Sequence, residues 1–369
     1  MSLPASSQDR SRSLPSTALT SPAAIERLMA SLVGDVRAHA IRTALVLPES
    51  APSAAAPGPD VLPTRVSRSE IASALAGVLF DDVQRRVPMA RAYVEDSGRA
   101  GHALVFDHGA LRTVHAPSGD LPRGAAAFAR ILEPLGYERR GTYDLTRIGM
   151  TGFAYAHVDL PEAIPQYFVS ELHPERFSDE FQAAVQRVVG KSSDPITSGA
   201  QRLLDQLATD GFLPREDALA LLPALTSAFD RQHEEPRLED YEALLAESAE
   251  MAWIATEGNA FNHATDRVAD VFAVADHQRR LGRPIKDSVE VSANGNVMQT
   301  AFRAARIERL FRSEAGHMVV REVPGSFHEF ITRRTLADGT LDLTFDAGNA
   351  TSIFKMTAGE EESERQESA

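Results

Sequence analysis

The chain repeats one order of expected secondary structure in two segments that lie far apart in the sequence. Each segment opens with a strand-like run, continues with apolar residues at helical spacing, and ends in further strand-like runs. The opening runs share a His-x-x-x-Arg pattern, HGALR at 108–112 and HATDR at 263–267. This repetition indicates an internal duplication and predicts an α+β fold built from two β-α-β-β-β modules.

The runs that carry this prediction differ in length but keep the same order. In the first segment the expected helix spans 121–137, and the expected strands span 102–114, 138–145, 150–160 and 166–173. In the second segment the expected helix spans 269–282, and the expected strands span 259–268, 288–294, 297–311, 317–323 and 326–334.

Composition along the chain predicts the regions around these modules. A Ser/Pro-rich stretch begins the chain, Pro and Ala dominate 48–63, and helical patterns at 21–41 and 67–87 flank that loop. Helical patterns also fill the region between the modules, at 177–190, 199–212, 215–229 and 238–255. The predicted division is a disordered lead (1–21), a helical region with the Pro/Ala loop (22–100), the first module (101–174), a helical insertion (175–250), the second module with a closing segment (251–356) and an acidic tail (357–369).

Charge and cysteine content exclude several classes of function. The net charge of −14 argues against a nucleic-acid-binding surface. The chain has no cysteine, so disulfides, thiolate metal ligands and a catalytic thiol are excluded, and any metal must be held by His, Asp or Glu. No apolar run reaches the roughly 18 residues that a membrane span needs, and the first 21 residues lack the apolar core of a secretory signal. We expect no membrane partner and a cytoplasmic location.

The strand-like run VFDHGALRTV at 105–114 holds His108 and Arg112 four residues apart. Residues i, i+2 and i+4 of a strand share one face, so His108, Ala110 and Arg112 point the same way, with open space over the small alanine. The pattern suits a metal ligand beside a clamp for a carboxylate. It suits two ordinary surface residues equally well.

Two further residues can complete a metal site with His108. His263 opens the second module as His108 opens the first, and the last strand of that module carries the adjacent pair His328 and Glu329. Alternation allows only one of this pair to face a shared cavity. Two imidazoles and one carboxylate form the facial triad of non-haem Fe(II) oxygenases, which favours Glu329. The alternative is that Glu329 pairs with an arginine on an exposed sheet face.

Three other residues are candidates for supporting roles around such a site. Gln299 can bind a substrate or orient a ligand, or it can make an ordinary contact between strands. His157 can line the cavity or serve as a hydrogen-bonded structural histidine. Arg333 shares its strand face with Glu329 and is predicted to support the metal site without binding the metal itself.

Five blocks of this chain resemble the 2-oxoadipate dioxygenase/decarboxylase family of the vicinal-oxygen-chelate superfamily. They are DHGALR (107–112), NHATDR (262–267), VMQTAFRA (297–304), SFHEFITRR (326–334) and FDAGNATSIF (345–354). The EF-x-x-R ending is also similar to that of hydroxyphenylpyruvate dioxygenases. The resemblance implies paired βαβββ modules that form a curved mixed sheet around a metal, with a helical insertion between them.

The resemblance also implies roles for individual residues. His108, His263 and Glu329 would bind the metal, expected to be Fe(II), and His108 and Arg112 would contact the substrate. Where the family has a Val-Ser stretch that contacts substrate through its backbone, this chain has Gly348 and Asn349.

The implied activity is an Fe(II)-dependent dioxygenase and decarboxylase of a 2-oxo acid. Its partners would be a small 2-oxo dicarboxylic acid and O2, with 2-oxoadipate converted to 2-hydroxyglutarate and CO2 in lysine catabolism. Two rival hypotheses remain on the same fold. A glyoxalase-type metal-dependent lyase or isomerase would show a fourth protein ligand near the three, and a non-catalytic binding protein would use the cavity for sequestration.

Overall fold

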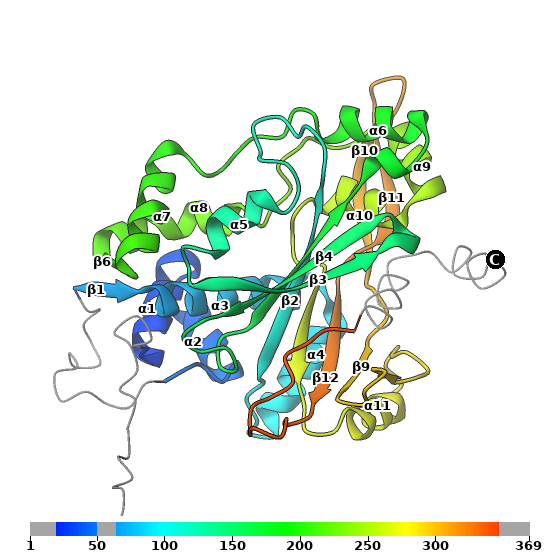
Figure 1. Ribbon diagram of the computed structural model, residues 1–369. Coiled ribbons are helices and arrows are strands. Elements are labelled where there is room, and N and C mark those ends of the chain that lie inside the picture. The colour runs from blue at the N-terminus through cyan, green and yellow to red at the C-terminus, as the bar shows by residue number, and fades with distance from the viewer. Residues whose placement is uncertain (1–19, 50–63, 347–369) are drawn as a thin grey trace, which may run out of the picture.

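A curved eight-stranded sheet forms the centre of the computed structural model, which describes residues 20–49 and 64–346 (Figure 1). Most of the predicted lead and of the Pro/Ala loop, the acidic tail, Gly348 and Asn349 lie outside the described residues. The strands occur in the order β3-β4-β5-β2-β7-β12-β9-β8. Their bounds are β2 (Phe106–Val114), β3 (Tyr137–Leu145), β4 (Met150–His157), β5 (Gln166–Leu172), β7 (His263–Arg267), β8 (Glu290–Val291), β9 (Val297–Ala301) and β12 (Phe327–Arg333).

The two halves of this sheet have the same topology, which confirms the predicted paired modules. In the first, β2 leads through helix α5 (Ala126–Leu132) into the meander β3-β4-β5, and β5 returns parallel to β2. In the second, β7 leads through helix α11 (Val271–Arg280) to β8 and β9, and β12 returns parallel to β7. The antiparallel pairing of β2 with β7 joins the modules. The opening strand of each module therefore lies at the middle of the sheet.

Burial along the strands follows their place in the sheet. All nine residues of β2 and all seven of β5 are buried, which explains why their sequences are apolar with few interruptions. The strand β3 lies at the edge, and most of its residues are at least partly exposed. Polar side chains buried in the central strands consequently need partners inside the protein.

Four helices precede the first module. They are α1 (Pro22–Val33), α2 (Asp35–Ala44), α3 (Arg68–Arg86) and α4 (Pro88–Arg99). The single helix expected at 21–41 is wrong, because Gly34 adopts a positive φ of 81° and separates α1 from α2. A capping box between Ser67 and Glu70 begins α3, and nearly the whole first half of this helix is buried against its neighbours.

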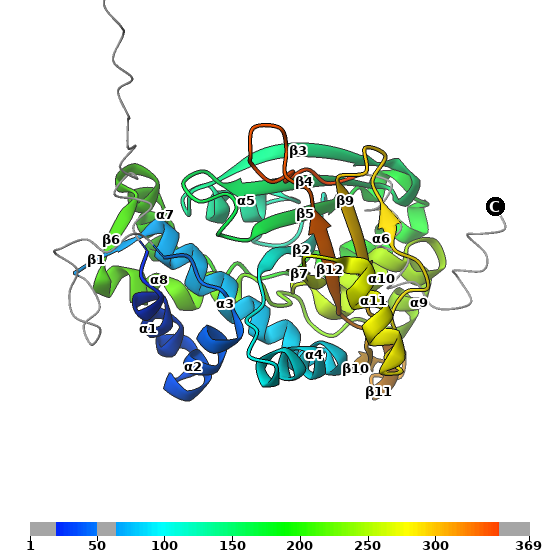
Figure 2. The same cartoon turned by 90° about the horizontal axis from the view of Figure 1, so that it is seen from below.

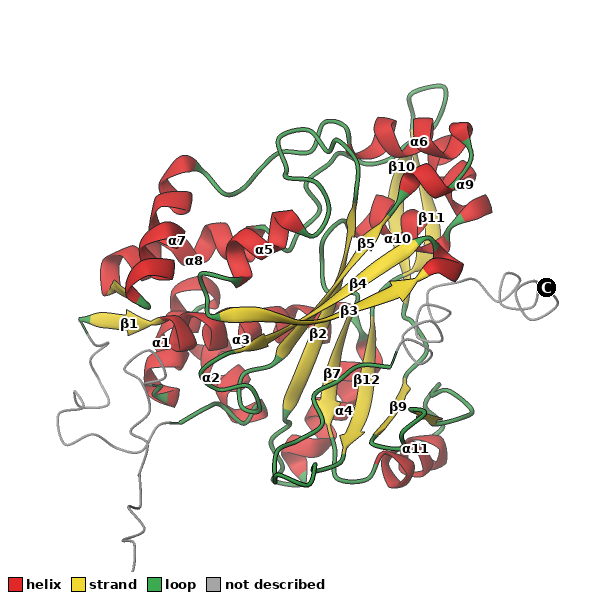
Figure 3. Cartoon of the chain, in the orientation of Figure 1, coloured by secondary structure: helices red, strands yellow, loops and turns green. Residues whose placement is uncertain are grey.

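The region between the modules is not wholly helical, and its helices lie in two places. Helices α7 (Ser198–Asp210) and α8 (Arg215–Ser227) lie with the N-terminal helices, whereas α6 (Asp179–Val189), α9 (Leu238–Glu247) and α10 (Ala249–Glu257) lie at the opposite end of the sheet (Figures 1 and 3). The helix expected at 238–255 breaks at Ser248, which caps α10. Between α7 and α8, the strand β6 (Phe212–Pro214) pairs with β1 (Arg65–Ser67). Within the described residues, no helix is long and apolar enough to cross a bilayer.

A hairpin interrupts the second module between β9 and β12. The strand expected at 297–311 is two strands, because the chain leaves the central sheet after Ala301 and re-forms as β10 (Arg306–Arg312). This strand pairs with β11 (Met318–Pro324) in a separate two-stranded sheet that packs on α9 through Phe311 and Tyr241. Short 3-10 helices at Thr146–Ile148 and Pro174–Arg176 complete the described elements.

Asp266 supplies a pH-dependent contribution to stability where α4 meets β7. Tyr93 Oη donates to its carboxylate at 2.7 Å and Val105 N at 3.0 Å, and burial raises the pKa of Asp266 to about 6. The folded chain therefore favours the neutral acid and loses stability as the pH rises from about 4 to about 6. We expect the free energy of unfolding of the wild type, measured by urea denaturation, to fall by up to about 3 kcal/mol more than that of Asp266→Asn between about pH 4 and pH 6. The same loss in both proteins would contradict this assignment, and the exposed Asp276→Asn controls for removal of a charge.

Candidate metal centre

Three side chains from three neighbouring strands converge on one buried point. His108 comes from β2, His263 from β7 and Glu329 from β12, and one ligand atom of each lies within 4.8 Å of the others. Glu329 Oε2 lies 3.2 Å from His108 Nε2 and 3.5 Å from His263 Nε2. Adjacent ligands on an octahedral ion with bonds of about 2.1 Å are about 3 Å apart, so both distances from the carboxylate to an imidazole are close to that of adjacent ligands.

The strand register explains why Glu329 meets His108 across an intervening strand. Thr265 on β7 is paired with His108 on one side and with Glu329 on the other. Its hydroxyl donates to Glu329 Oε2 at 2.6 Å and lies 3.1 Å from His108 Nε2. Thr265 thus orients the carboxylate, a role that the sequence analysis did not assign although the residue lies in the NHATDR block.

The residue that precedes each histidine orients its imidazole. Asp107 Oδ1 lies 2.8 Å from His108 Nδ1, and Asn262 Oδ1 lies 3.0 Å from His263 Nδ1. Consecutive side chains of a regular strand point to opposite faces, but the pairing of β2 with β7 shifts register between Phe106 and His108. With Nδ1 donating to these oxygens, each Nε2 keeps its lone pair for a metal.

The electrostatics of the three ligands favour a bound cation. Burial opposes ionisation of Glu329, yet its contacts with His108, His263 and the Thr265 hydroxyl hold the pKa of this carboxyl below its ordinary value. Although burial opposes it, Asp107 and Glu329 raise the pKa of His108, and a bound cation would take the place of the proton on its Nε2. Burial lowers the pKa of His263 to about 3, so this ring is neutral and can act as a ligand. Among the described residues, Glu329 Oε1 has no hydrogen-bond partner. A buried carboxylate with one unsatisfied oxygen beside two imidazole nitrogens is a donor set that suits a divalent transition metal.

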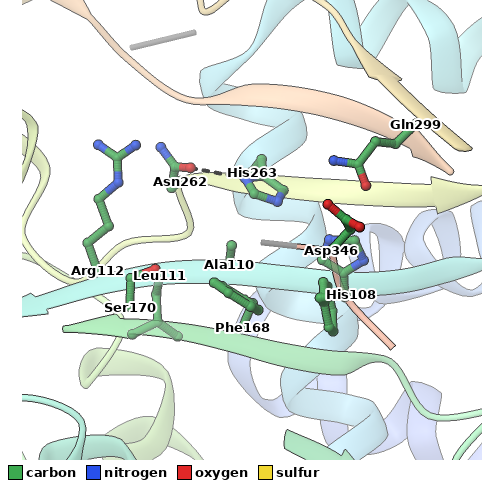
Figure 4. A pocket seen from close by; sticks show the side chains of 11 residues that line it. His108, Ala110, Leu111, Arg112, Phe168, Ser170, Asn262, His263, Gln299 and Asp346 are labelled. Carbon is green, nitrogen blue, oxygen red and sulfur yellow. Dashed lines mark hydrogen bonds between the residues drawn. The ribbon is translucent and has the colours of Figure 1, made fainter. Parts of the chain in front are cut away.

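A pocket extends from His108 and His263 toward Arg112 (Figure 4). In Figure 4 Arg112 lies at one end, His108, Gln299 and Asp346 lie at the other, and Ala110 and Phe168 lie between. His108, Ala110 and Arg112 all line the pocket, as expected for one face of β2. The full lining consists of His108, Ala110, Leu111, Arg112, Phe168, Ser170, Asn262, His263, Gln299, Phe345 and Asp346.

Arg112 is a buried cation at the far end of this pocket. Its guanidinium carbon lies 5.1 Å from the ring centre of Trp253 on α10. Burial lowers the pKa of Arg112 to about 10, and the negative charge of Glu250 on the same helix opposes that shift. The side chain is therefore charged at neutral pH and faces a pocket where an anion can reach it.

Comparison with known proteins identifies the family. The family model for 2-oxoadipate dioxygenase/decarboxylase matches residues 74–366. The chain belongs to this family. A search of curated proteins found no match.

Solved structures show the same fold as this family member. A glyoxalase-superfamily protein from Ralstonia eutropha JMP134 is 53% identical, with a TM-score of 0.83 over 89% of this chain and 100% of the other. The hydroxyglutarate synthase from Oryza sativa, in complex with 2-oxoadipate, is 20% identical, with a TM-score of 0.60 over 85% and 100% of the two chains. That from Pseudomonas putida, also with 2-oxoadipate, is 19% identical, with a TM-score of 0.51 over 92% and 74%.

The structure separates the remaining candidates in this member of the family. Gln299 lines the pocket, and Arg333 donates to Asp107, the residue that orients His108. His157 lies away from the pocket, where its Nδ1 accepts hydrogen bonds from the backbone of residues 159 and 160. His328 faces the opposite side of the sheet, 5.4 Å from the Tyr93 ring centre. Because Glu329 is wholly buried beside His108 and His263, the alternative of an exposed pair with an arginine is wrong.

Removing the Thr265 hydroxyl tests whether this strand register prepares a metal site. We expect Thr265→Val to weaken Co(II) binding by about tenfold, because the carboxylate loses the donor that orients it. Isothermal titration of metal-free protein measures the affinity. Thr113→Val is the matched control, since this buried hydroxyl donates to the Ser170 backbone oxygen and touches none of the three ligands. Equal affinities for Thr265→Val and the wild type would contradict the role.

Proposed function

We propose that this family member is an Fe(II)-dependent dioxygenase that decarboxylates 2-oxoadipate to 2-hydroxyglutarate, the reaction expected in lysine catabolism. One observation carries the proposal: both histidines of a buried His-His-Glu group line the same pocket as a buried arginine. The first suits a transition metal, and the second suits the far carboxylate of a dicarboxylic acid.

We propose His108, His263 and Glu329 as the metal ligands. Fe(II) held by these three residues would supply oxygen activation and a template for chelating the 2-oxo acid. Across residues 20–49 and 64–346, no fourth imidazole or carboxylate belongs to the cluster. A lyase or isomerase of the glyoxalase type is expected to add such a ligand, so the three-residue set supports the oxygenase over that rival.

The rest of the pocket suits the remainder of the substrate. The Arg112 guanidinium would bind the far carboxylate with two parallel hydrogen bonds, a geometry that lysine cannot reproduce. Ala110 and Phe168, between Arg112 and the metal ligands, would contact the methylene chain. Gln299 lies where it can hydrogen-bond the oxo-acid end. The resemblance adds Gly348 and Asn349, which lie outside the described residues, as proposed backbone contacts.

The proposed reaction needs no general base. The bond between C1 and C2 breaks, and C1 leaves as CO2 with its own two oxygen atoms. One atom of O2 completes the new carboxylate at the former C2, and the other becomes the hydroxyl group of 2-hydroxyglutarate. The protein's part is to hold the two ends of the acid and to keep bulk water away from the reacting carbon. The Phe345 ring, 4.9 Å from the His108 ring centre, covers the site on one side.

Oxygen uptake tests this function directly. The metal-free protein is reconstituted anaerobically with Fe(II), and O2 consumption is followed with 2-oxoadipate and with 2-oxohexanoate, which lacks the far carboxylate. We expect uptake with 2-oxoadipate that matches CO2 and 2-hydroxyglutarate formation one to one, and little uptake with 2-oxohexanoate. No uptake with any 2-oxo acid would contradict the proposal and favour a binding protein.

Replacing Arg112 separates substrate binding from metal binding. We expect Arg112→Lys to raise KM for 2-oxoadipate by about tenfold to a hundredfold, because a bidentate charged contact is lost, and to leave Fe(II) affinity unchanged. Steady-state kinetics and metal titration give the two quantities. Arg68→Lys is the control, since it breaks another bidentate pair, with Asp159, outside the pocket. Unaltered KM in Arg112→Lys would overturn the assignment.

A further inference from the structure

We propose that Arg333 is a positioning residue that couples the segment closing the pocket to the metal ligand His108. We call residues 342–345 the closing strap. The inference rests on the proposed function, because it takes His108 as a metal ligand. It adds a link between the metal and the strap through one guanidinium.

The guanidinium of Arg333 is fully buried and divides its donors between two parts of the chain. On one edge, Nε lies 3.0 Å from both Asp107 oxygens and Nη2 lies 2.9 Å from Oδ1. On the other side, Nη1 donates to the backbone oxygens of Asp342 at 2.9 Å and Thr344 at 2.8 Å. A rigid planar fork can satisfy both groups at once, whereas a lysine ammonium has no such geometry.

Asp107 passes this restraint to the metal site. The oxygen that accepts from Arg333 Nη2 is the one that binds His108 Nδ1 at 2.8 Å. Because Asp107 is buried and both its oxygens are bound by Arg333, the orientation of its side chain depends on that guanidinium. Any movement of Arg333 therefore changes the hydrogen bond that holds the His108 imidazole.

The closing strap reaches the same histidine from the other side. Phe345 lies edge-on to His108, with the planes at 86°, and its ring centre is 5.2 Å from the Arg333 guanidinium carbon. The chain after β12 runs toward β3 (Figure 2). In the strap, Phe345 N donates to Tyr143 Oη on β3, and Leu343 O accepts from Gln166 Nε2 on β5. It thus spans both modules over the pocket.

The arrangement is specific to one of the two histidines. His263 is oriented by the neutral amide of Asn262. Among the described residues, no hydrogen bond or ring contact joins either residue to the strap. The half-buried bidentate pair of Arg130 with Asp194 involves none of the three candidate metal ligands. Coupling through Arg333 therefore predicts that a bound metal and a closed strap stabilise one another by the same factor.

The test measures both sides of this coupling in the full-length protein. Co(II) affinity is measured by titration of metal-free protein, and strap opening by the rate at which chymotrypsin cleaves after Phe345, followed by mass spectrometry. In the wild type we expect Co(II) to slow this cleavage by about fivefold or more. In Arg333→Lys we expect Co(II) affinity to fall by about tenfold and the protection by Co(II) to disappear.

Two further variants keep the test decisive. Arg130→Lys is the matched control and should retain both Co(II) affinity and protection. Asp107→Asn breaks the link between Arg333 and His108 with little change of shape. We expect it to lower Co(II) affinity and to abolish protection as well, so it replaces Arg333→Lys if that variant does not fold. Arg333 acts on His108 through Asp107, so the two substitutions break the same link. The double variant Arg333→Lys/Asp107→Asn should therefore lose about as much Co(II) affinity as either single variant.

The outcomes distinguish this inference from the proposed function. If the wild type binds no Co(II), the metal site itself is wrong and the coupling falls with it. If the wild type binds Co(II) but Arg333→Lys keeps wild-type affinity and protection, only the role of Arg333 is overturned. Faster cleavage of Arg333→Lys with undiminished protection by Co(II) would make Arg333 a structural residue and nothing more.

Discussion

The pairing of β7 with β2 on one side and with β12 on the other is the constraint on which the site depends. It joins the two modules and sets the register in which Thr265 lies between His108 and Glu329. A slip of one residue in either pairing would turn one of these side chains to the opposite face of the sheet. The fold and the candidate metal centre are therefore specified by the same hydrogen bonds between strands.

Burying so many polar side chains in the central strands would destabilise the fold unless each side chain had a hydrogen-bond or charge partner. Glu329 lies against two imidazoles and a hydroxyl, and Asp107 lies against His108 and the Arg333 guanidinium. Such a network is tolerated because its members satisfy one another, and it leaves one carboxylate oxygen of Glu329 for a ligand. Arg112 packs near Trp253 at the other end of the pocket, and the apolar side chains of Ala110 and Phe168 lie between this cation and His108.

Much of the fold followed from the sequence because strand alternation and duplication are local patterns. The same alternation allowed only one of His328 and Glu329 to face the cavity, and the facial-triad pattern favoured Glu329. The family resemblance is confirmed by the family match. Thr265 and Asp107 were not assigned roles, because their positions depend on register and on an irregularity in β2 that no local pattern reveals. The breaks at Gly34 and Ser248 and the departure from the sheet after β9 were missed because hydrophobic periodicity continues across them. The three-residue strand β6 was missed because it is too short to show a periodicity. The predicted domain boundaries and the ligand roles stay predictions.

The proposed chemistry requires that two imidazoles and one carboxylate bind a single metal ion. X-ray absorption at the iron edge, on protein loaded anaerobically with one equivalent of Fe(II), reports these ligands. We expect stoichiometric iron in an oxygen and nitrogen shell with the scattering of two imidazoles, reduced to one in His263→Ala. Failure to retain iron, or a spectrum that His263→Ala leaves unchanged, would contradict it.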